Sequence, residues 1–245
     1  APYAVHTPLM PNPKYIDKYQ NIDKREAAYA TMIESADAAL GSVLAKLDAL
    51  GIADNTIVIF TSDNGGLSAH ARGGEPHLHN APLRSGKGSA YEGGIRVPLI
   101  VQGLDKKPTV NDAYVITHDL FPTILGYAGV EIPPNHVVDG ITLGAAEITR
   151  VIGWHQPHQW GAAGPGIEPF TAIRQGKWKL IFFHAGERYE LYDLEKDIGE
   201  INNVTLENLE IFQKMRLLLN EWARARKAQP SILTETGESV LWLDK

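Results

Sequence analysis

A short apolar run that ends in polar residues and two glycines places the strongest constraint on this chain. The run, Ile57–Phe60, is followed two residues later by Asp-Asn-Gly-Gly at positions 63–66. Consecutive apolar residues bounded by turn residues are typical of a strand buried on both faces. In an open α/β sheet, ligands bind just beyond the carboxyl ends of such strands. An acid and an amide oxygen suit a hard cation such as calcium or magnesium, although Asp-Asn-Gly also forms ordinary turns. Asp63 and Asn64 are therefore candidate metal ligands.

Composition excludes several kinds of site. The 245 residues are 44% hydrophobic, carry a net charge of −6 and include no cysteine. A sizeable core is therefore possible, whereas disulfides, zinc–thiolate sites and a cysteine nucleophile are excluded from this chain. The acidic balance gives no general basic surface for nucleic acid. No apolar run approaches the length that crosses a membrane.

The order of the elements predicts an α/β fold. Apolar residues at spacings of three and four predict a helix over Lys24–Leu50, ended by Gly51. A short turn then leads into the strand at 57–60, and a further strand is expected at Val97–Gln102. Helix, turn and buried strand are typical of α/β crossovers, so we expect a mostly parallel sheet flanked by helices. A helix near 117–129, with Thr117 as its N-cap, completes this part.

The pattern changes near residue 151, which predicts two domains, 1–150 and 151–245. Alternating residues around Gln175 and Gly176 predict a hairpin over 171–183, and a further strand follows at 189–193. A helix over Leu206–Lys227 has an apolar face that would pack on this small antiparallel sheet.

Two loops carry candidate binding residues. The loop 67–83 contains His70, Arg72 and His77; a zinc site at His77-x-His79, a substrate-reading surface and a solvated loop all remain open. Lys87 lies between two glycines, so its ammonium can approach a bound oxyanion closely. The segment is not a P-loop, because Gly88 stands where Ser or Thr would follow the lysine.

Several motifs together resemble the type I sulfatases of the alkaline-phosphatase superfamily. They are H-T-P at 6–8, S-D-N-G-G at 62–66, P-L-R-S-G-K-G-S-A-Y-E-G-G-I-R-V-P at 82–98 and E-L-Y-D-L-E-K-D at 190–197. The resemblance covers nearly the whole chain, and the paired S-D-N-G-G and R-x-G-K-G segments are its specific part.

The resemblance implies a role for each matching residue. Asp63 and Asn64 would bind calcium, with magnesium as an alternative. His6 and Lys87 would contact the sulfate ester, and His6 would also help the leaving group depart. Arg84 would bind substrate or support the site. His70, Arg72 and His77 would contact the substrate beyond the sulfate, whereas Glu92 and Arg96 are expected to be buried structural partners.

One part of the family pattern is missing. The formylglycine nucleophile of these enzymes is made from the Cys or Ser of a C/S-x-P-x-R motif, and no serine of this chain lies in that context. The chain resembles the C-terminal portion of a sulfatase and is expected to be inactive alone. A complementary N-terminal sulfatase chain or a homo-oligomer is the expected partner, and a sulfated small molecule or glycan the expected substrate.

Other functions stay open from sequence alone. A phosphonate or phosphodiester hydrolase of the same superfamily would use the same metal and lysine chemistry. A non-catalytic binding or structural fragment would need neither. No signal peptide is recognised in this sequence, so the compartment is left open; the resemblance alone suggests a periplasmic or secreted protein.

Overall fold

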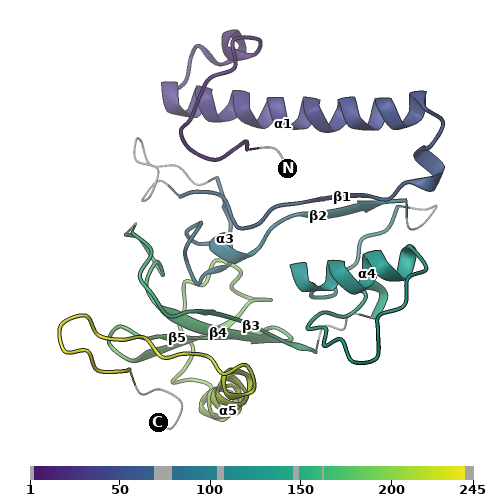
Figure 1. The fold of residues 1–245 in the computed structure, drawn as a ribbon. Coiled ribbons are helices and arrows are strands. Elements are labelled where there is room, and N and C mark those ends of the chain that lie inside the picture. Colours follow the sequence, from purple (N-terminus) through teal and green to yellow (C-terminus); the bar gives the residue numbers. More distant parts are fainter. Residues whose placement is uncertain (1–2, 69–78, 104–107, 146–148, 162, 241–245) are drawn as a thin grey trace. The chain divides into compact units, whose positions relative to one another are not determined.

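The computed structural model describes residues 3–68, 79–103, 108–145, 149–161 and 163–240. The chain forms two compact units (Figure 1). The first contains Ala1–Ser62 and Pro98–Pro108; the second begins at Asp63 and contains Leu78–Val97 and Thr109–Lys245. These units do not follow the predicted division at residue 150, which stays a prediction. Among the described residues, no helix has both the length and the apolar composition needed to cross a membrane.

The long helix α1, Lys24–Ala49, dominates the first unit, as predicted. It begins at Asp23, whose carboxylate accepts hydrogen bonds from the backbone N–H groups of Arg25 and Glu26 at 2.9 and 3.2 Å. Such a cap satisfies donors that have no partner inside the helix. Gly51 follows the helix with φ of +67°, the left-handed conformation that glycine adopts without strain. Short 3₁₀ turns, Ile16–Tyr19 and Ala53–Asn55, flank α1.

The predicted apolar stripe of α1 is buried only near its start. Ala27, Ala28 and Met32 are buried, whereas Ile33 is 47% and Val43 is 53% exposed. The periodicity therefore predicted the helix correctly, but among the described residues the apolar side chains of the C-terminal half of α1 are not buried.

The two strands of the first unit pair antiparallel, and the expected mostly parallel sheet is not found among the described residues. Strand β1, Val58–Thr61, pairs with β2, Leu99–Gln102, so that Val58 lies opposite Gln102. A parallel return needs a crossover of a dozen or more residues, usually a helix. The only described helix between these strands is α3, Glu92–Ile95, which has four residues. Strand β1 is also less buried than predicted, since Phe60 is 40% exposed.

A four-stranded antiparallel sheet forms the base of the second unit, with the order β3-β4-β5-β6. The predicted hairpin is confirmed: Gln175 lies opposite Trp178, and Gly176 in the turn has φ of +57°. The strand β3 was not predicted, because the glycines and prolines around it indicated a loop. The strands are β3, Val151–Gln156; β4, Phe170–Gln175; β5, Trp178–Phe183; and β6, Arg188–Asp193.

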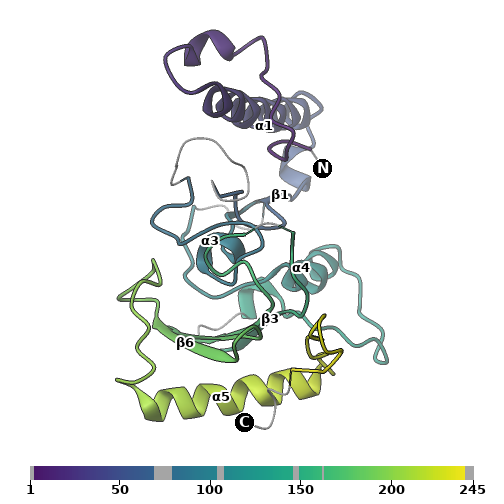
Figure 2. The ribbon, with the colours of Figure 1, turned by 90° about the vertical axis from the view of Figure 1, so that its left-hand side faces the viewer.

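Each face of this sheet has its own apolar cluster. Helix α5, Leu209–Ala225, lies along one face (Figure 2). There its Met215 and Leu219 pack with Ile173, Leu180 and Leu191. On the opposite face, Ala90 and Tyr91 pack with strand residues, namely Phe170, Ala172, Ile181, Phe183 and Tyr192. The segment that follows Lys87 is thus part of the core, which gives the Lys87 loop a rigid support.

A buried aspartate organises the remaining helix, α4, Leu120–Tyr127, with the 3₁₀ turns Thr117–Asp119 and Leu143–Ala145. Asp119 accepts hydrogen bonds from the backbone N–H groups of Ile116 and Ile141 at 2.8 and 3.0 Å and pairs with Arg150 at 2.7 Å. The predicted N-cap Thr117 is therefore wrong. The carboxylate of Asp119 satisfies the helix-end donor in its place.

A chain of buried hydrogen bonds joins two strands to the segment after α5. The Nε2 atom of His184 lies 2.8 Å from the Thr171 hydroxyl, and its Nδ1 lies 2.6 Å from the Ser231 hydroxyl. His155 contacts the same Thr171 hydroxyl at 2.8 Å. Burial lowers the pKa of His184 to about 4, with a smaller contribution from His155, and burial also lowers the pKa of His155. Both rings are therefore neutral in the folded protein at pH 7.

We expect acid to destabilise the fold through these histidines. The unfolded state binds their protons near pH 6.5, whereas the folded state resists protonation until a lower pH. Stability is therefore complete above about pH 7 and falls as the pH drops from 6.5 toward 4. Urea unfolding at several pH values measures this slope. His184→Gln, which is neutral at every pH, should flatten it; an unchanged slope would contradict the assignment.

Candidate functional site

Backbone contacts between two glycine-rich loops build the candidate site. The N–H of Gly65 donates to the carbonyl of Gly94 at 3.0 Å, and the N–H of Lys87 donates to the carbonyl of Gly66 at 3.0 Å. A Cβ atom at position 65 would collide with the Gly93 carbonyl oxygen. Glycine is therefore required there by close backbone approach rather than by φ.

An asparagine side chain closes the same loops. The Asn80 amide nitrogen donates to the carbonyls of Gly66 and Ser85, both at 2.9 Å. The N–H of Gly93 donates to the Arg84 carbonyl at 3.0 Å. The segment that carries Lys87 is consequently held at several points along its backbone.

The two candidate metal ligands follow β1 directly. The Asp63 carboxylate accepts the N–H of Asn64 at 3.0 Å, and the Asn64 side-chain nitrogen donates to the Gly65 carbonyl at 3.0 Å. An asparagine binds a cation through its amide oxygen, and here it is the amide nitrogen that is bonded to the Gly65 carbonyl. A carboxylate and an amide oxygen match a hard cation. Calcium takes six to eight oxygens, and among the described residues no three His, Asp or Glu side chains gather around one point. The pair therefore fits part of a calcium site.

Lys87 is half-buried beside an aromatic ring. Its ammonium lies 6.0 Å from the centre of the Trp160 ring. The glycines on either side remove side-chain bulk around it, as the oxyanion-binding hypothesis requires. The structure thus brings Asp63, Asn64 and Lys87 into one cluster of loops in the second unit.

His6 is exposed and lies in the first unit. Its Nδ1 atom is 2.7 Å from the Thr7 carbonyl oxygen. A carbonyl only accepts, so Nδ1 carries the proton and Nε2 is the basic nitrogen of the neutral ring. The Tyr3 ring packs 5.2 Å from the His6 ring, centre to centre. These contacts orient the imidazole and are compatible with proton transfer at Nε2.

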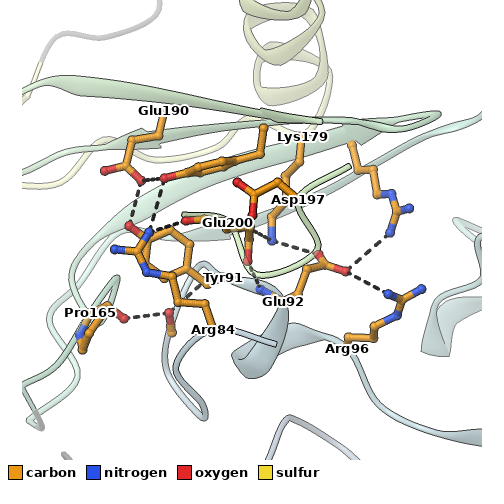
Figure 3. A network of polar contacts seen from close by, with 12 residues as sticks. Arg84, Tyr91, Glu92, Arg96, Pro165, Lys179, Glu190, Asp197 and Glu200 are labelled. Carbon is orange, nitrogen blue, oxygen red and sulfur yellow. Dashed lines mark hydrogen bonds and ion pairs between the residues drawn. The ribbon is translucent and has the colours of Figure 1, made fainter. Parts of the chain in front are cut away.

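Arg84 makes its contacts with protein groups (Figure 3). Its guanidinium donates to the Glu200 carbonyl at 2.6 Å and to the Tyr192 hydroxyl at 3.4 Å. It also stacks over the Tyr91 ring, 4.0 Å from its centre. The contacts favour the supporting role that the sequence left open, and substrate binding by Arg84 stays a prediction.

Three predicted substrate contacts, His70, Arg72 and His77, lie outside the described residues. Their proposed roles stay predictions.

A buried ion cluster fixes the segment beyond Lys87 (Figure 3). Glu92 lies 2.9 Å from the Lys179 ammonium, 3.5 Å from Arg174 and 3.9 Å from Arg96. Burial alone raises the pKa of Glu92, but Lys179, with Arg174, outweighs this effect and holds the pKa below its ordinary value. Glu92 and Arg96 are the structural partners that the sequence predicted, although Arg96 is half exposed rather than buried.

Lys179 is shared with a second buried carboxylate. Its ammonium lies 2.9 Å from Glu200, which also accepts the backbone N–H of Glu92 at 2.6 Å. Burial raises the pKa of Glu200, and the attraction of Lys179 does not fully offset this effect. The pKa of Glu200 is therefore raised, whereas that of Glu92 is lowered. Sequence reasoning missed both Lys179 and Glu200. The available signal was a lysine inside the apolar strand W-K-L-I-F-F at 178–183, where an unpaired charge would be too costly.

Comparisons with known proteins identify the family of this chain. Residues 1–130 match the sulfatase family model, and residues 86–225 match the model for the C-terminal part of N-sulphoglucosamine sulphohydrolase. The chain belongs to the sulfatase family.

Curated relatives are about twice as long as this chain. A sulfatase from Formosa agariphila is 32% identical over 271 residues, covering 97% of this chain and 48% of the relative. An N-acetylgalactosamine-6-O-sulfatase from Bacteroides thetaiotaomicron is 28% identical, covering 88% and 44%. The chain therefore spans about half the length of the curated relatives it matches.

Solved structures share the fold. The crystal structure of Ps i-CgsB in complex with k-i-k-neocarrahexaose superposes with a TM-score of 0.73 at 27% identity, covering 90% of this chain and 48% of that one. A phosphonate monoester hydrolase of Agrobacterium radiobacter shares the fold with a TM-score of 0.59 at 24% identity.

Gly65→Ala should destabilise the protein, because the new methyl group meets a backbone carbonyl that cannot move independently. We expect a loss of about 1–3 kcal/mol in the free energy of unfolding, typical of overpacking. Gly41→Ala is the matched control: no atom lies within 4 Å of its Cβ in α1, so helix propensity should stabilise by about 0.5–1 kcal/mol. Urea unfolding measures the stability of both variants. Equal changes in the free energy of unfolding would contradict the close approach between Gly65 and the Gly93 carbonyl.

Lys179→Met should be more damaging, because it leaves Glu92 and Glu200 buried without their shared cation. Removal of one partner from a buried ion pair costs about 3–5 kcal/mol. The triple variant with Glu92→Gln and Glu200→Gln removes the uncompensated charge and should recover part of the loss. Thermal and urea unfolding measure both. Equal stability of Lys179→Met and the unmodified protein would rule out the inferred cluster.

Proposed function

We propose that the protein containing this chain hydrolyses a sulfate ester, with this chain supplying the sulfate-binding lysine, an acid–base histidine and part of a metal site. The observation that carries the proposal is the backbone bond from Lys87 to Gly66, which joins the Lys87 loop to the loop that contains Asp63 and Asn64, in a chain of the sulfatase family.

Lys87 would stabilise the negative charge that develops during the reaction. In sulfate ester hydrolysis, negative charge builds on the sulfate oxygens and on the departing alcohol oxygen. An ammonium placed next to this charge stabilises it, and the Lys87 backbone that carries the ammonium is already bonded to Gly66. The ion pairs among Glu92, Lys179 and Glu200 hold the end of the Lys87 loop against the sheet.

Asp63 and Asn64 would hold calcium, with magnesium as the alternative. When bound, the cation would polarise the sulfate oxygens as a Lewis acid. The remaining ligands would have to come from outside the described residues.

His6 would act as a general acid. Its Nδ1–H donates to the Thr7 carbonyl, so Nε2 would be the atom that, when protonated, gives its proton to the alcohol oxygen as the S–O bond of the ester breaks. This role is an expectation from the family motif H-T-P together with the orientation of the ring.

The nucleophile would come from elsewhere. Formylglycine supplies it in the family, and no serine of this chain stands in a C/S-x-P-x-R context. We infer that a segment outside this chain provides it, in the same polypeptide, in a complementary chain or in a second copy, and that this chain alone is inactive.

A sulfated carbohydrate is the proposed substrate class. One relative is named as an N-acetylgalactosamine-6-O-sulfatase, and a solved structure with the same fold contains a carrageenan oligosaccharide. Both observations concern proteins of which this chain covers about half.

The test is steady-state kinetics of the full-length natural protein on sulfated monosaccharides. Loss of a group that stabilises transition-state charge lowers kcat by about 10²–10³, so we expect a decrease of this size for Lys87→Ala. Lys196→Ala, which removes an exposed lysine, is the control and should leave kcat unchanged. Removal of metal with a chelator should abolish activity, and Asp63→Asn should weaken its restoration by calcium.

Three results would contradict the proposal. Faster turnover of phosphate diesters or phosphonates than of sulfate esters would favour the other hydrolase class. No turnover of any ester by the full-length protein would favour a non-catalytic role. Full activity of residues 1–245 alone would show that the nucleophile lies within this chain.

A further inference from the structure

A second loop is attached to the segment that carries Lys87. The Ser89 hydroxyl donates to the Pro165 carbonyl at 2.9 Å (Figure 3). The N–H of Ala90 donates to the Gly166 carbonyl at 3.0 Å. A Cβ at Gly166 would lie 2.6 Å from the Tyr91 ring. The loop after β3 and the Lys87 loop are therefore held together by backbone bonds and by close packing.

This attachment places one indole beside the lysine. Trp160 is half-buried, and its ring lies against Gly88, where any Cβ would collide with it. Gly88 has φ of +86°, so both its conformation and its lack of a side chain admit the ring. The Lys87 ammonium is 6.0 Å from the ring centre. The Gln159 side chain donates to the carbonyls of Trp160 and Ile167 at 2.9 and 3.3 Å, which orders the loop around the ring.

The chemistry of an indole limits what this ring can do. The face of an aromatic ring carries negative potential, so it does not attract a sulfate. A separation of 6.0 Å is the outer limit for a cation–π contact, so the ring does not compete strongly with an anion for Lys87. What remains is a flat, rigid, apolar surface next to the ammonium. Ligand sites combine a few polar groups with such surfaces, which fix the orientation of the ligand.

We propose that Trp160 is a specificity-determining residue whose indole packs against the sugar ring that carries the sulfate held by Lys87. This inference rests on the proposed function, and it adds the group that recognises the alcohol part of the ester. The C–H groups of one sugar face supply the apolar partner surface, while the sulfate extends toward the ammonium.

The test uses the full-length natural protein with Trp160→Ala, Trp160→Leu and Trp160→Phe. Leu keeps bulk against Gly88 without a ring, and Phe keeps a ring. The substrates are N-acetylgalactosamine 6-sulfate and methyl sulfate, which has no ring. Inorganic sulfate serves as a competitive inhibitor and reports the affinity of Lys87 for the anion.

An aromatic contact is worth about a factor of ten in affinity. We therefore expect Trp160→Ala and Trp160→Leu to raise KM for the sulfated sugar by about tenfold, with kcat within about threefold. The kinetics on methyl sulfate and the inhibition constant for sulfate should stay unchanged. Trp160→Phe should keep most of the affinity. Trp178→Ala is the matched control, because Trp178, the first residue of β5, also has a lysine beside its ring, with the Lys177 ammonium 5.1 Å from the ring centre. This variant should leave KM unchanged.

The outcomes separate the inference from the function beneath it. A parallel weakening of sulfate inhibition would show that Trp160 acts on Lys87, which overturns the inference and leaves sulfate ester hydrolysis intact. An unchanged KM for the sugar in both Trp160→Ala and Trp160→Leu would also overturn the inference alone. An unmodified protein that hydrolyses none of these esters would overturn both.

Discussion

The ion pairs of the buried Lys179 on β5 are the interactions on which the rest of the second unit depends. Lys179 is fully buried, with Glu92 on one side and Glu200 on the other. A charge in that position is tolerated only when it is paired. The pairing ties three separate parts of the chain together: the end of the Lys87 loop, the central strands of the antiparallel sheet and the turn after β6. Arg84 and Tyr91 strengthen the same junction through Glu200 and Glu190. The sheet is thus the support of the candidate site, although it contributes none of the proposed catalytic groups.

Local signals predicted the elements well and their pairing poorly. Helix α1, the hairpin at Gly176 and helix α5 follow from periodicity and from turn residues, which act over a few positions. The direction of the β1–β2 pair did not follow, because it depends on what lies between the strands over nearly forty residues. Strand β3 was not predicted, because the neighbouring glycines and prolines are typical of a loop. Gly153 within it has a packing reason that sequence alone does not reveal: a Cβ there would lie 2.5 Å from the Trp222 ring.

The candidate site also contains residues that the sequence predicted and residues that it did not predict. The residue types at Asp63, Asn64 and Lys87 follow from the chemistry of cations and oxyanions and from the family motifs. The supports of that site were not predicted. Asn80 acts through loop contacts with Gly66 and Ser85 that follow no regular spacing, and Lys179 and Glu200 act through contacts with Glu92, which is far away in the sequence. Trp160 was not predicted as a site residue. Its position next to Lys87 comes from the bonds between Ser89 and Pro165 and between Ala90 and Gly166.

The sequence separation of these supports has a consequence for how the protein is made. The contact between Glu92 and Lys179 spans 87 residues, and that between Arg84 and Glu200 spans 116. Contacts this distant form late, because long loops must close before they contribute. During synthesis, which proceeds from the N-terminus, the Lys87 loop leaves the ribosome well before Lys179 and Glu200 exist. The Lys87 loop therefore stays without its ionic support until the C-terminal sheet has been translated, and the lysine that we propose to bind sulfate reaches its final geometry only after that.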